Sequence, residues 1–226
     1  MRELILVPII HVSADLGSLA KDVNKVGLVS FGEDILKEHG VTVEKFWGVI
    51  SGYFNSIDVS GMKIYQDGMF ADGEMAERIV EDGVKSGSRN CELIASLLKR
   101  GAVLLRTEDF NLVKEERDIL VALTQAKSII RTLIALIKYK FVKNGLLKKR
   151  DEFIAKMIGR TLCHGERGIL FIGAYHNIKS KLPEDIEVIE MKDTRKVREY
   201  QQLLPYCVKN RIRFEELGRY LIEPVK

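Results

Sequence analysis

The chain has 226 residues, of which 46% are hydrophobic, so it is long enough to bury a core, and we expect one domain over residues 1–226. Its 36 Lys and Arg residues are nearly balanced by 32 Asp and Glu residues. Both signs are mixed along the chain, whereas a dedicated nucleic-acid binder concentrates its basic residues in one stripe. We therefore expect no nucleic-acid partner.

The cysteines and the apolar runs bear on the cellular location of the protein. Cys91, Cys163 and Cys207 are far apart and form no CxxC pair, which argues against a disulfide framework. The start of the chain lacks the apolar core and cleavage site of a signal peptide. The densest apolar run, SIIRTLIALIKYKF, contains Arg131 and Lys138 and is too short for a membrane span. We expect a cytoplasmic protein without a membrane partner, and its many Lys, Glu, Ile and Val with few Gln are typical of a thermophile.

Short apolar runs alternate with segments of helical periodicity along the chain. The runs predict strands at residues 4–10, 62–65, 102–105, 169–172 and 186–191. The periodic segments predict helices at residues 42–54, 74–83, 88–100, 112–143, 147–164 and 195–221. This alternation is typical of an α/β fold. We expect a mostly parallel central sheet of about five strands, with helices on both faces.

Local signals predict where several helices begin and end. Thr42 and Ser88 are expected to act as N-caps, and Gly101 to follow the C-terminus of the helix that Ser88 begins. Asn144-Gly145 is expected to end the long helix, and Pro205 to break the last helical segment. The long helix could also provide a contact for a homo-oligomer.

Polar residues follow four of the predicted strands, two of which lead to a histidine. They are His11 and Asp15 after the first, Gln66 and Asp67 after the second, Glu108 after the third, and Gly173 and His176 after the fourth. In a parallel sheet all these carboxyl ends open on one side, where α/β proteins bind ligands. The alternative is that any strand must end in polar residues, because loops lie at the surface.

A charged pair begins the helix at residues 147–164. Asp151 precedes Ile154, Ile158 and Leu162 by three, seven and eleven residues, so it shares their apolar face. A charge in that position needs a partner or a polar cavity, and we expect Arg150 and Asp151 to orient or bind substrate. The alternative is an exposed Asp favoured by the helix dipole beside a solvated Arg.

Three stretches, IIHVSADLGSLAKDV, RDEFIAKMI and GILFIGAYHNI, resemble the TraB and Tiki proteins and their erythromycin-esterase and ChaN-like relatives. That superfamily has two Gly-x-x-His motifs and an Arg-Asp or Arg-Asn helix before the second. Gly173-Ala174-Tyr175-His176 is the second motif, and Arg150-Asp151 precedes it. Pro8-Ile9-Ile10-His11 keeps the histidine of the first motif but lacks its glycine. The middle of the chain resembles an uncharacterised prokaryotic branch.

The resemblance implies a central-sheet α/β fold in which the two histidines meet at one edge. Its members differ in chemistry, because Tiki proteins resemble metal-dependent proteases, the esterase-like members need no obvious metal, and ChaN-like proteins bind haem. Likeness of fold therefore does not choose a reaction. The function expected for this chain is a hydrolase acting on a small-molecule or peptide substrate, with water activated by the paired histidines.

Two catalytic schemes use the same residues. In the first, His11, His176 and Glu108 hold a divalent metal ion that lowers the pKa of its bound water. In the second, one histidine is the general base, oriented by Asp15 or Glu108, and Arg150 holds an anionic substrate or the developing oxyanion. The sequence does not choose between these schemes.

The remaining polar residues at the sheet edge are assigned to substrate binding. They are Asp15, Gln66, Asp67, Asp151 and Gly173. The rival function is a non-enzymatic ligand-binding or regulatory protein with the same fold, which binds haem or a small anion. For a nucleotide- or RNA-binding protein, residues 85–90, KSGSRN, could cradle an anion at a helix start, but ordinary capping by Ser88 is the favoured explanation.

Overall fold

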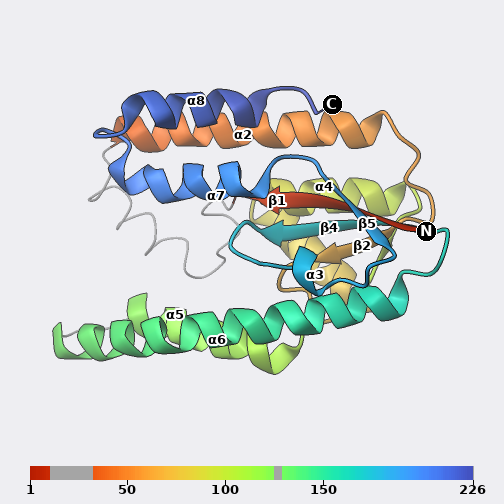
Figure 1. The fold of residues 1–226 in the computed structure, drawn as a ribbon, viewed down its shortest axis with the longest axis horizontal. Coiled ribbons are helices and arrows are strands. Elements are labelled where there is room, and N and C mark those ends of the chain that lie inside the picture. The colour runs from red at the N-terminus through yellow and green to blue at the C-terminus, as the bar shows by residue number, and fades with distance from the viewer. Residues whose placement is uncertain (11–32, 125–128, 226) are drawn as a thin grey trace.

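The computed structural model describes residues 1–10, 33–124 and 129–225. Its five strands are β1 (Arg2–Ile9), β2 (Lys63–Gln66), β3 (Val103–Leu104), β4 (Arg167–Gly173) and β5 (Ile186–Glu190). They form one parallel sheet in the order β3-β2-β4-β1-β5 (Figure 1). The predicted α/β class and the number of strands are confirmed.

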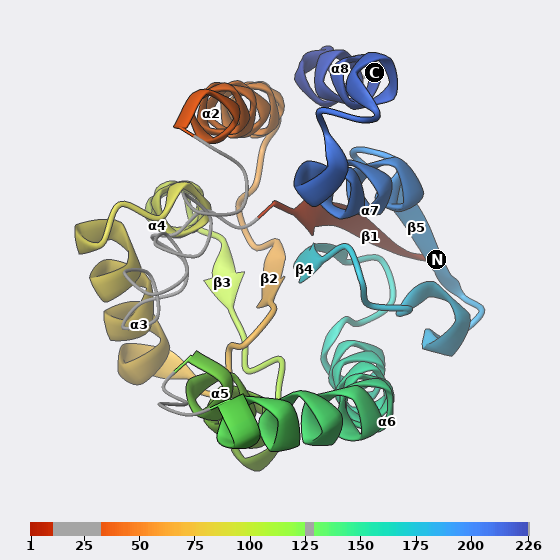
Figure 2. The same cartoon turned by 90° about the vertical axis from the view of Figure 1, so that its left-hand side faces the viewer.

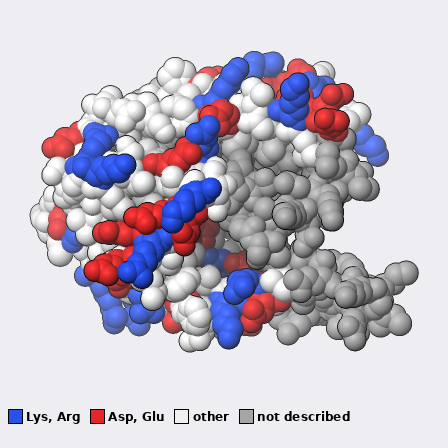
Figure 3. All heavy atoms as spheres, turned by 180° about the vertical axis from the view of Figure 1, so that it is seen from behind, with Lys and Arg blue, Asp and Glu red and all other residues white. Residues whose placement is uncertain are grey.

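Helices cover both faces of this sheet. They are α2 (Glu33–Asn55), α3 (Gly73–Lys85), α4 (Arg89–Lys99), α5 (Phe110–Thr124), α6 (Ile129–Thr161), α7 (Thr194–Leu203) and α8 (Arg211–Ile222). Figure 2 shows α2, α7 and α8 on one side of the sheet and α5 and α6 on the other. No helix in the described ranges is long and apolar enough to cross a membrane. On the face seen in Figure 3, cationic and anionic side chains are interleaved, as the mixed charge of the sequence predicts.

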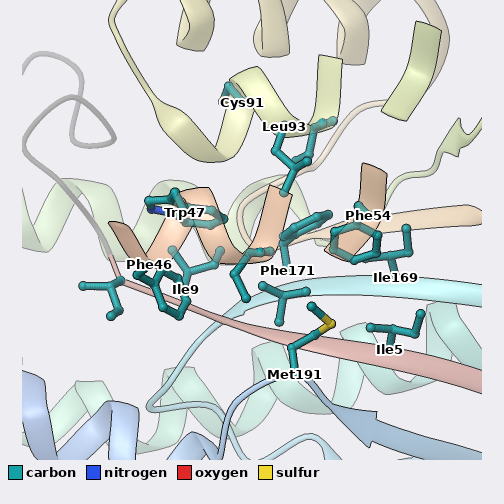
Figure 4. Close-up of a cluster of buried hydrophobic side chains, with 14 of the residues drawn as sticks. Ile5, Ile9, Phe46, Trp47, Phe54, Cys91, Leu93, Ile169, Phe171 and Met191 are labelled. Carbon is teal, nitrogen blue, oxygen red and sulfur yellow. The ribbon is translucent and has the colours of Figure 1, made fainter. Parts of the chain in front are cut away.

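The strands are apolar on both faces because each face packs against helices. In β1, Ile5 and Val7 join the larger core cluster with α2, α4, α7 and α8, whereas Leu4 and Leu6 join a second cluster with α6. Figure 4 shows the larger cluster, with Phe54 of α2 beside β4. Successive residues of a strand point to opposite faces, so a strand covered on both sides reads as one continuous apolar run.

Some helix ends agree with the predicted signals and others do not. Ser88 accepts a hydrogen bond from the Cys91 amide at 3.2 Å and caps α4, and Gly101 follows that helix with a φ of 89°. Pro205 lies in the short 3-10 turn η3 (Leu204–Tyr206) that separates α7 from α8. The capping of α4 explains the KSGSRN segment without a bound anion.

Two predicted helix boundaries are wrong. Thr42 is inside α2, where its hydroxyl donates to the Glu38 carbonyl, because this hydroxyl can bond one turn back as well as cap. Asn144-Gly145 does not end a helix, since α6 continues through it to Thr161. A glycine inside a helix costs only about 1 kcal/mol, which packing of the flanking turns can offset.

Pro8 is tolerated in a central strand because of where β5 ends. The pairing of β1 with β5 stops at Leu6, whose carbonyl accepts from the Met191 amide. In a strand, the backbone groups of residues i and i+2 point to the same neighbouring strand. An N–H at position 8 would therefore point to the β5 side, as the Leu6 carbonyl does, but at a level past the last residue of β5. On the other side, Pro8 pairs with Ile172 of β4. The departure from the glycine of the first motif therefore costs β1 no ladder hydrogen bond.

Candidate functional site

The turn after β4 places His176 in a buried position at the carboxyl edge of the sheet. The His176 amide donates to the Gly173 carbonyl at 3.1 Å, which closes the turn. Its ring Nδ1 lies 2.6 Å from Oδ1 of Asp151, and the Asn177 amide donates to Oδ2 of the same carboxylate at 3.0 Å. Asp151 is on the apolar face of α6 because that face covers this turn. It has a partner, which is one of the alternatives that the sequence left open.

Asp67, which directly follows β2, connects His176 to a second group of charges. Its Oδ2 accepts from the Gly173 amide at 2.9 Å and lies 3.4 Å from His176 Nε2. Its Oδ1 accepts from the Arg150 guanidinium at 2.5 Å. One carboxylate therefore holds the end of β4, the ring of His176 and the start of the packed part of α6.

The Arg150 guanidinium is surrounded by three carboxylates. Its Nε donates to Glu108 Oε2 at 2.7 Å, and its Nη2 donates to Glu108 Oε1 as well as to Asp67. Its Nη1 donates to Glu116 of α5. Arg150 is 4% exposed and Glu108 is fully buried, and Glu108 also accepts from the Gly68 amide at 2.8 Å. We call Asp67, Glu108, Glu116, Arg150, Asp151 and His176 the edge cluster.

Burial and charge shift the pKa values in the edge cluster. Burial raises the pKa of Glu108 to about 7, although the hydrogen bonds from Arg150 act in the opposite direction. Burial alone would lower the pKa of His176, but Asp67 and Asp151 outweigh it and raise the value to about 10. Burial also opposes the charge of Arg150, yet its carboxylate partners raise its pKa above the ordinary value. His176 is therefore an imidazolium at neutral pH and can donate from both ring nitrogens.

The structure brings together most of the residues that the sequence assigned to the site. Glu108, Arg150, Asp67, Asp151 and His176 belong to one hydrogen-bonded cluster, and Gly173 contributes its amide to it. Gln66 ends β2, and its Oε1 has no hydrogen-bond partner in the part of the chain that is described. His11 and Asp15 lie outside the described residues.

The contacts of Arg150 and Glu108 revise two predicted roles. Arg150 was expected to hold an anionic substrate, but its charge is already matched by three carboxylates. Glu108 was expected to bind a metal, but both its oxygens accept from Arg150. Within the described ranges, no three His, Cys, Asp or Glu side chains are arranged to hold a metal ion. A haem iron at His176 would have to displace Asp67 or Asp151 from the ring.

Glu116 is the one member of the edge cluster that the sequence did not indicate. It lies in the segment VKEERD of α5, which reads as a solvated charged run. The side chain is one-third exposed, with a relative exposure of 34%. Its partner is 34 positions away in the sequence. No local signal links these two residues, because the contact depends on how α5 packs against α6.

No protein-family model, curated protein or solved structure matches this chain. The likeness to the TraB and Tiki proteins therefore stays a prediction from the motifs. The chemistry of the site has to be argued from its geometry.

Proposed function

We propose that this protein is a hydrolase whose reacting centre lies at the carboxyl edge of the sheet between β4 and β1. The single observation that carries the proposal is the position of His176 at a topological switch point. The connection that leaves β1 leads to β2 on one side, and the one that leaves β4 leads to β5 on the other. Between such strands α/β proteins have a crevice for ligands.

His176 is suited to act as an acid at this edge of the sheet. Its Nδ1 is fixed by Asp151 at 2.6 Å, while its Nε2 is 3.4 Å from Asp67, which is longer than a normal hydrogen bond. The Nε2 proton is therefore held loosely, and a substrate oxygen could take over its bond. A pKa of about 10 keeps that proton in place at neutral pH.

His11 is the proposed base. It follows β1 as His176 follows β4, and because Ile9 is paired with Gly173 the two motifs begin on neighbouring strands one residue out of register. In the proposed reaction, His11 takes a proton from water as the water oxygen attacks the carbonyl carbon. His176 then donates its Nε2 proton to the leaving oxygen or nitrogen as its bond to carbon breaks. After the reaction His11 carries the extra proton and His176 lacks one. Loss of a proton from His11 to solvent and uptake of one by His176 restore the starting state.

The proposed substrate is a neutral ester or amide of a small molecule or peptide. Arg150 is matched by three carboxylates, so it supplies no free positive charge for an anionic substrate. Gln66 Oε1 at the end of β2 is a buried acceptor with no hydrogen-bond partner in the described residues, so an amide or hydroxyl group of a substrate could bond to it once the atoms that cover it are displaced.

The test is hydrolysis of p-nitrophenyl acetate, p-nitrophenyl butyrate and a matched p-nitroanilide. We expect His176→Gln and His11→Gln each to lower kcat/KM by about 10²-fold or more. His164→Gln is the matched control, because His164 is exposed and lies at the opposite end of the strands, where its ring contacts the N-terminal amine. We also expect kcat/KM to fall as pH rises past about 10, where His176 loses its proton. Wild-type rates equal to buffer, or a His176→Gln variant as active as wild type, would overturn the proposal.

A further inference from the structure

The helix α7 lies at the carboxyl edge of the sheet, on the side opposite to α6. Figure 2 looks at this edge, with α7 above the ends of β1 and β4 and with α5 and α6 below them. Arg198 Nε of α7 donates to the Ala174 carbonyl, directly after β4, at 2.7 Å. Gln201 Nε2, one turn further on, donates to the carbonyl of Ile9, the last residue of β1, at 3.2 Å. Side chains of α7 therefore contact both strands of the switch point.

Arg198 is half-buried and forms no salt bridge with any residue in the described ranges. The nearest carboxylates along the chain, Asp193 and Glu199, are paired with Arg195 and Arg213. No residue three or four positions from Arg198 is acidic, so α7 itself supplies no partner. Because its Nε is engaged by the strand-end carbonyl, the two Nη groups remain as donors without a partner in the described part of the chain.

The Gly-x-x-His turn connects Arg198 to the edge cluster. Its first residue, Gly173, donates its amide to the cluster, and its fourth, His176, is bound there through its ring. Its second residue, Ala174, accepts from Arg198. The ring of its third residue, Tyr175, has its centroid 6.0 Å from the guanidinium carbon of Arg198. The guanidinium is thus fixed to the same turn as the proposed acid, two residues before it.

The proposed reaction needs a positive charge that the edge cluster does not supply. When water attacks the carbonyl carbon, the electron pair of the C=O bond moves to oxygen, which becomes an oxyanion. The edge cluster contains four carboxylates and two cations, so its own charge opposes a further negative charge nearby. Of its two cations, Arg150 is paired with three carboxylates, and His176 gives its proton to the leaving group. A cation from outside the cluster would balance the new charge.

We propose that Arg198 is the catalytic residue that binds this oxyanion, an assignment that rests on the proposed hydrolase function. Its two Nη groups donate hydrogen bonds to the substrate oxygen, while its Nε stays on the Ala174 carbonyl and keeps the side chain in place. Such charge-assisted bonds are about twice as strong as neutral ones. No proton leaves the guanidinium. As the intermediate collapses, the electron pair returns from oxygen to form the C=O bond, and the bond from carbon to the leaving group breaks.

The kinetic test compares Arg198→Met with wild type in the hydrolysis of p-nitrophenyl acetate. Loss of an oxyanion donor should lower kcat by about 10²-fold and leave KM nearly unchanged, because the bond forms only in the transition state. Arg195→Met is the matched control, since Arg195 lies one turn earlier on α7 with a side chain that is 89% exposed, and its kcat should equal that of wild type.

Chemical rescue separates the charge of Arg198 from a purely structural role. In Arg198→Ala, guanidinium chloride at a concentration that leaves the protein folded should raise kcat by about tenfold or more. Urea is a neutral molecule of the same planar shape, so it should not raise kcat. A side chain that only supports the turn would show no such dependence on charge.

A binding measurement tests the same residue without turnover. p-Nitrophenyl methylphosphonate is a tetrahedral monoanion that resembles the oxyanion, and 4-nitroacetophenone is a neutral ketone of similar size. In calorimetry, Arg198→Met should weaken binding of the phosphonate by about tenfold or more and leave binding of the ketone unchanged. If Arg198→Met unfolds, Arg198→Lys replaces it in both measurements, because it keeps the charge but loses the two-pronged donor, and changes in the same direction are expected.

Three results would overturn the role of Arg198. They are an unchanged kcat in the folded variant, unchanged binding of the phosphonate, or equal rates of Arg198→Ala in guanidinium and in urea. The hydrolase proposal fails separately. No hydrolysis by wild type, together with phosphonate binding that depends on Arg198, would refute the hydrolase and leave Arg198 as an anion-binding residue at the strand edge. Hydrolysis that Arg198→Met leaves intact would refute only the assignment of Arg198.

Discussion

Replacement of Arg150 by Met is expected to destabilise the fold strongly. The change keeps most of the buried side-chain volume but removes the cation that holds Glu108, Asp67 and Glu116. Glu108 is fully buried and Asp67 is 13% exposed, so water can replace little of what they lose. Loss of one partner from a buried ion pair costs about 3–5 kcal/mol, because the remaining charge is left without compensation.

The structure places the expected cost at the lower end of this range. Glu116 is 34% exposed and solvent screens its pairing, so it adds little. The pKa of Glu108 is already about 7, so this carboxyl can take up a proton instead of staying charged. We therefore expect Arg150→Met to lower the free energy of unfolding by about 3 kcal/mol at pH 7, out of a usual total of about 5–15 kcal/mol.

Urea unfolding followed by circular dichroism measures this cost. Arg160→Met is the matched control, because Arg160 is exposed on the same helix, and a change within about 0.5 kcal/mol is expected for it. The double variant Arg150→Met with Glu108→Gln should recover about 1 kcal/mol or more, since it removes a charge that the first change left unpaired. A loss below about 1 kcal/mol for Arg150→Met would refute the view that the edge cluster is held together by this cation.

Three further measurements address other parts of the structure. The folded pKa values of Glu108 and His176, about 7 and about 10, are raised above the ordinary values of 4.5 and 6.5, so the folded state binds the extra protons. The free energy of unfolding should therefore fall as pH rises through each window. Glu108→Gln should remove the fall between pH 4.5 and 7, and His176→Gln should remove the fall between pH 6.5 and 10. A rise of wild-type stability in either window would contradict the shift assigned to that window. Gly83→Ala would place a Cβ 2.3 Å from Cys91 Sγ and should lower the free energy of unfolding by about 1–3 kcal/mol. Gly48→Ala has no atom within 4 Å of the new Cβ and should stabilise α2 by up to about 1 kcal/mol. Equal shifts of the melting temperature for the two variants would contradict this packing. Ser88→Ala should lower stability by about 1 kcal/mol through loss of the α4 cap, and an unchanged urea midpoint would show that this cap contributes nothing.

The strands and most helices could be predicted because their signals are local. A strand covered on both faces is apolar at every position, and a cap such as Ser88 acts within four residues. The helix boundaries predicted at Thr42 and Gly145 were wrong because they relied on local signals alone. A local preference of about 1 kcal/mol is overridden when the helix on both sides is packed. Leu146, next to that glycine, is 5% exposed.

For the site, the sequence indicated which residues come together but not how they pair. Asp151 on an apolar face was expected to have a partner or a polar cavity, and the parallel strand ends predicted Asp67 and His176 at one edge of the sheet. The residue types cannot say whether Glu108 meets a metal ion or a guanidinium, because a carboxylate suits both. That choice depends on the position of Arg150 on α6 relative to β3, which is a property of the packed structure.

The two carboxylate oxygens of Asp67 have different partners in the edge cluster. One oxygen is held by Arg150, and the other lies between the Gly173 amide and His176 Nε2. A substrate that drew the Nε2 proton away from Asp67 would leave this carboxylate with the amide and the guanidinium, both of which stay in place. The charge that remains is therefore stabilised before and after proton transfer, which is the condition for a group that supports an acid without moving. The same contacts explain how Arg150, which is paired with three carboxylates, can serve the proposed reaction through Asp67.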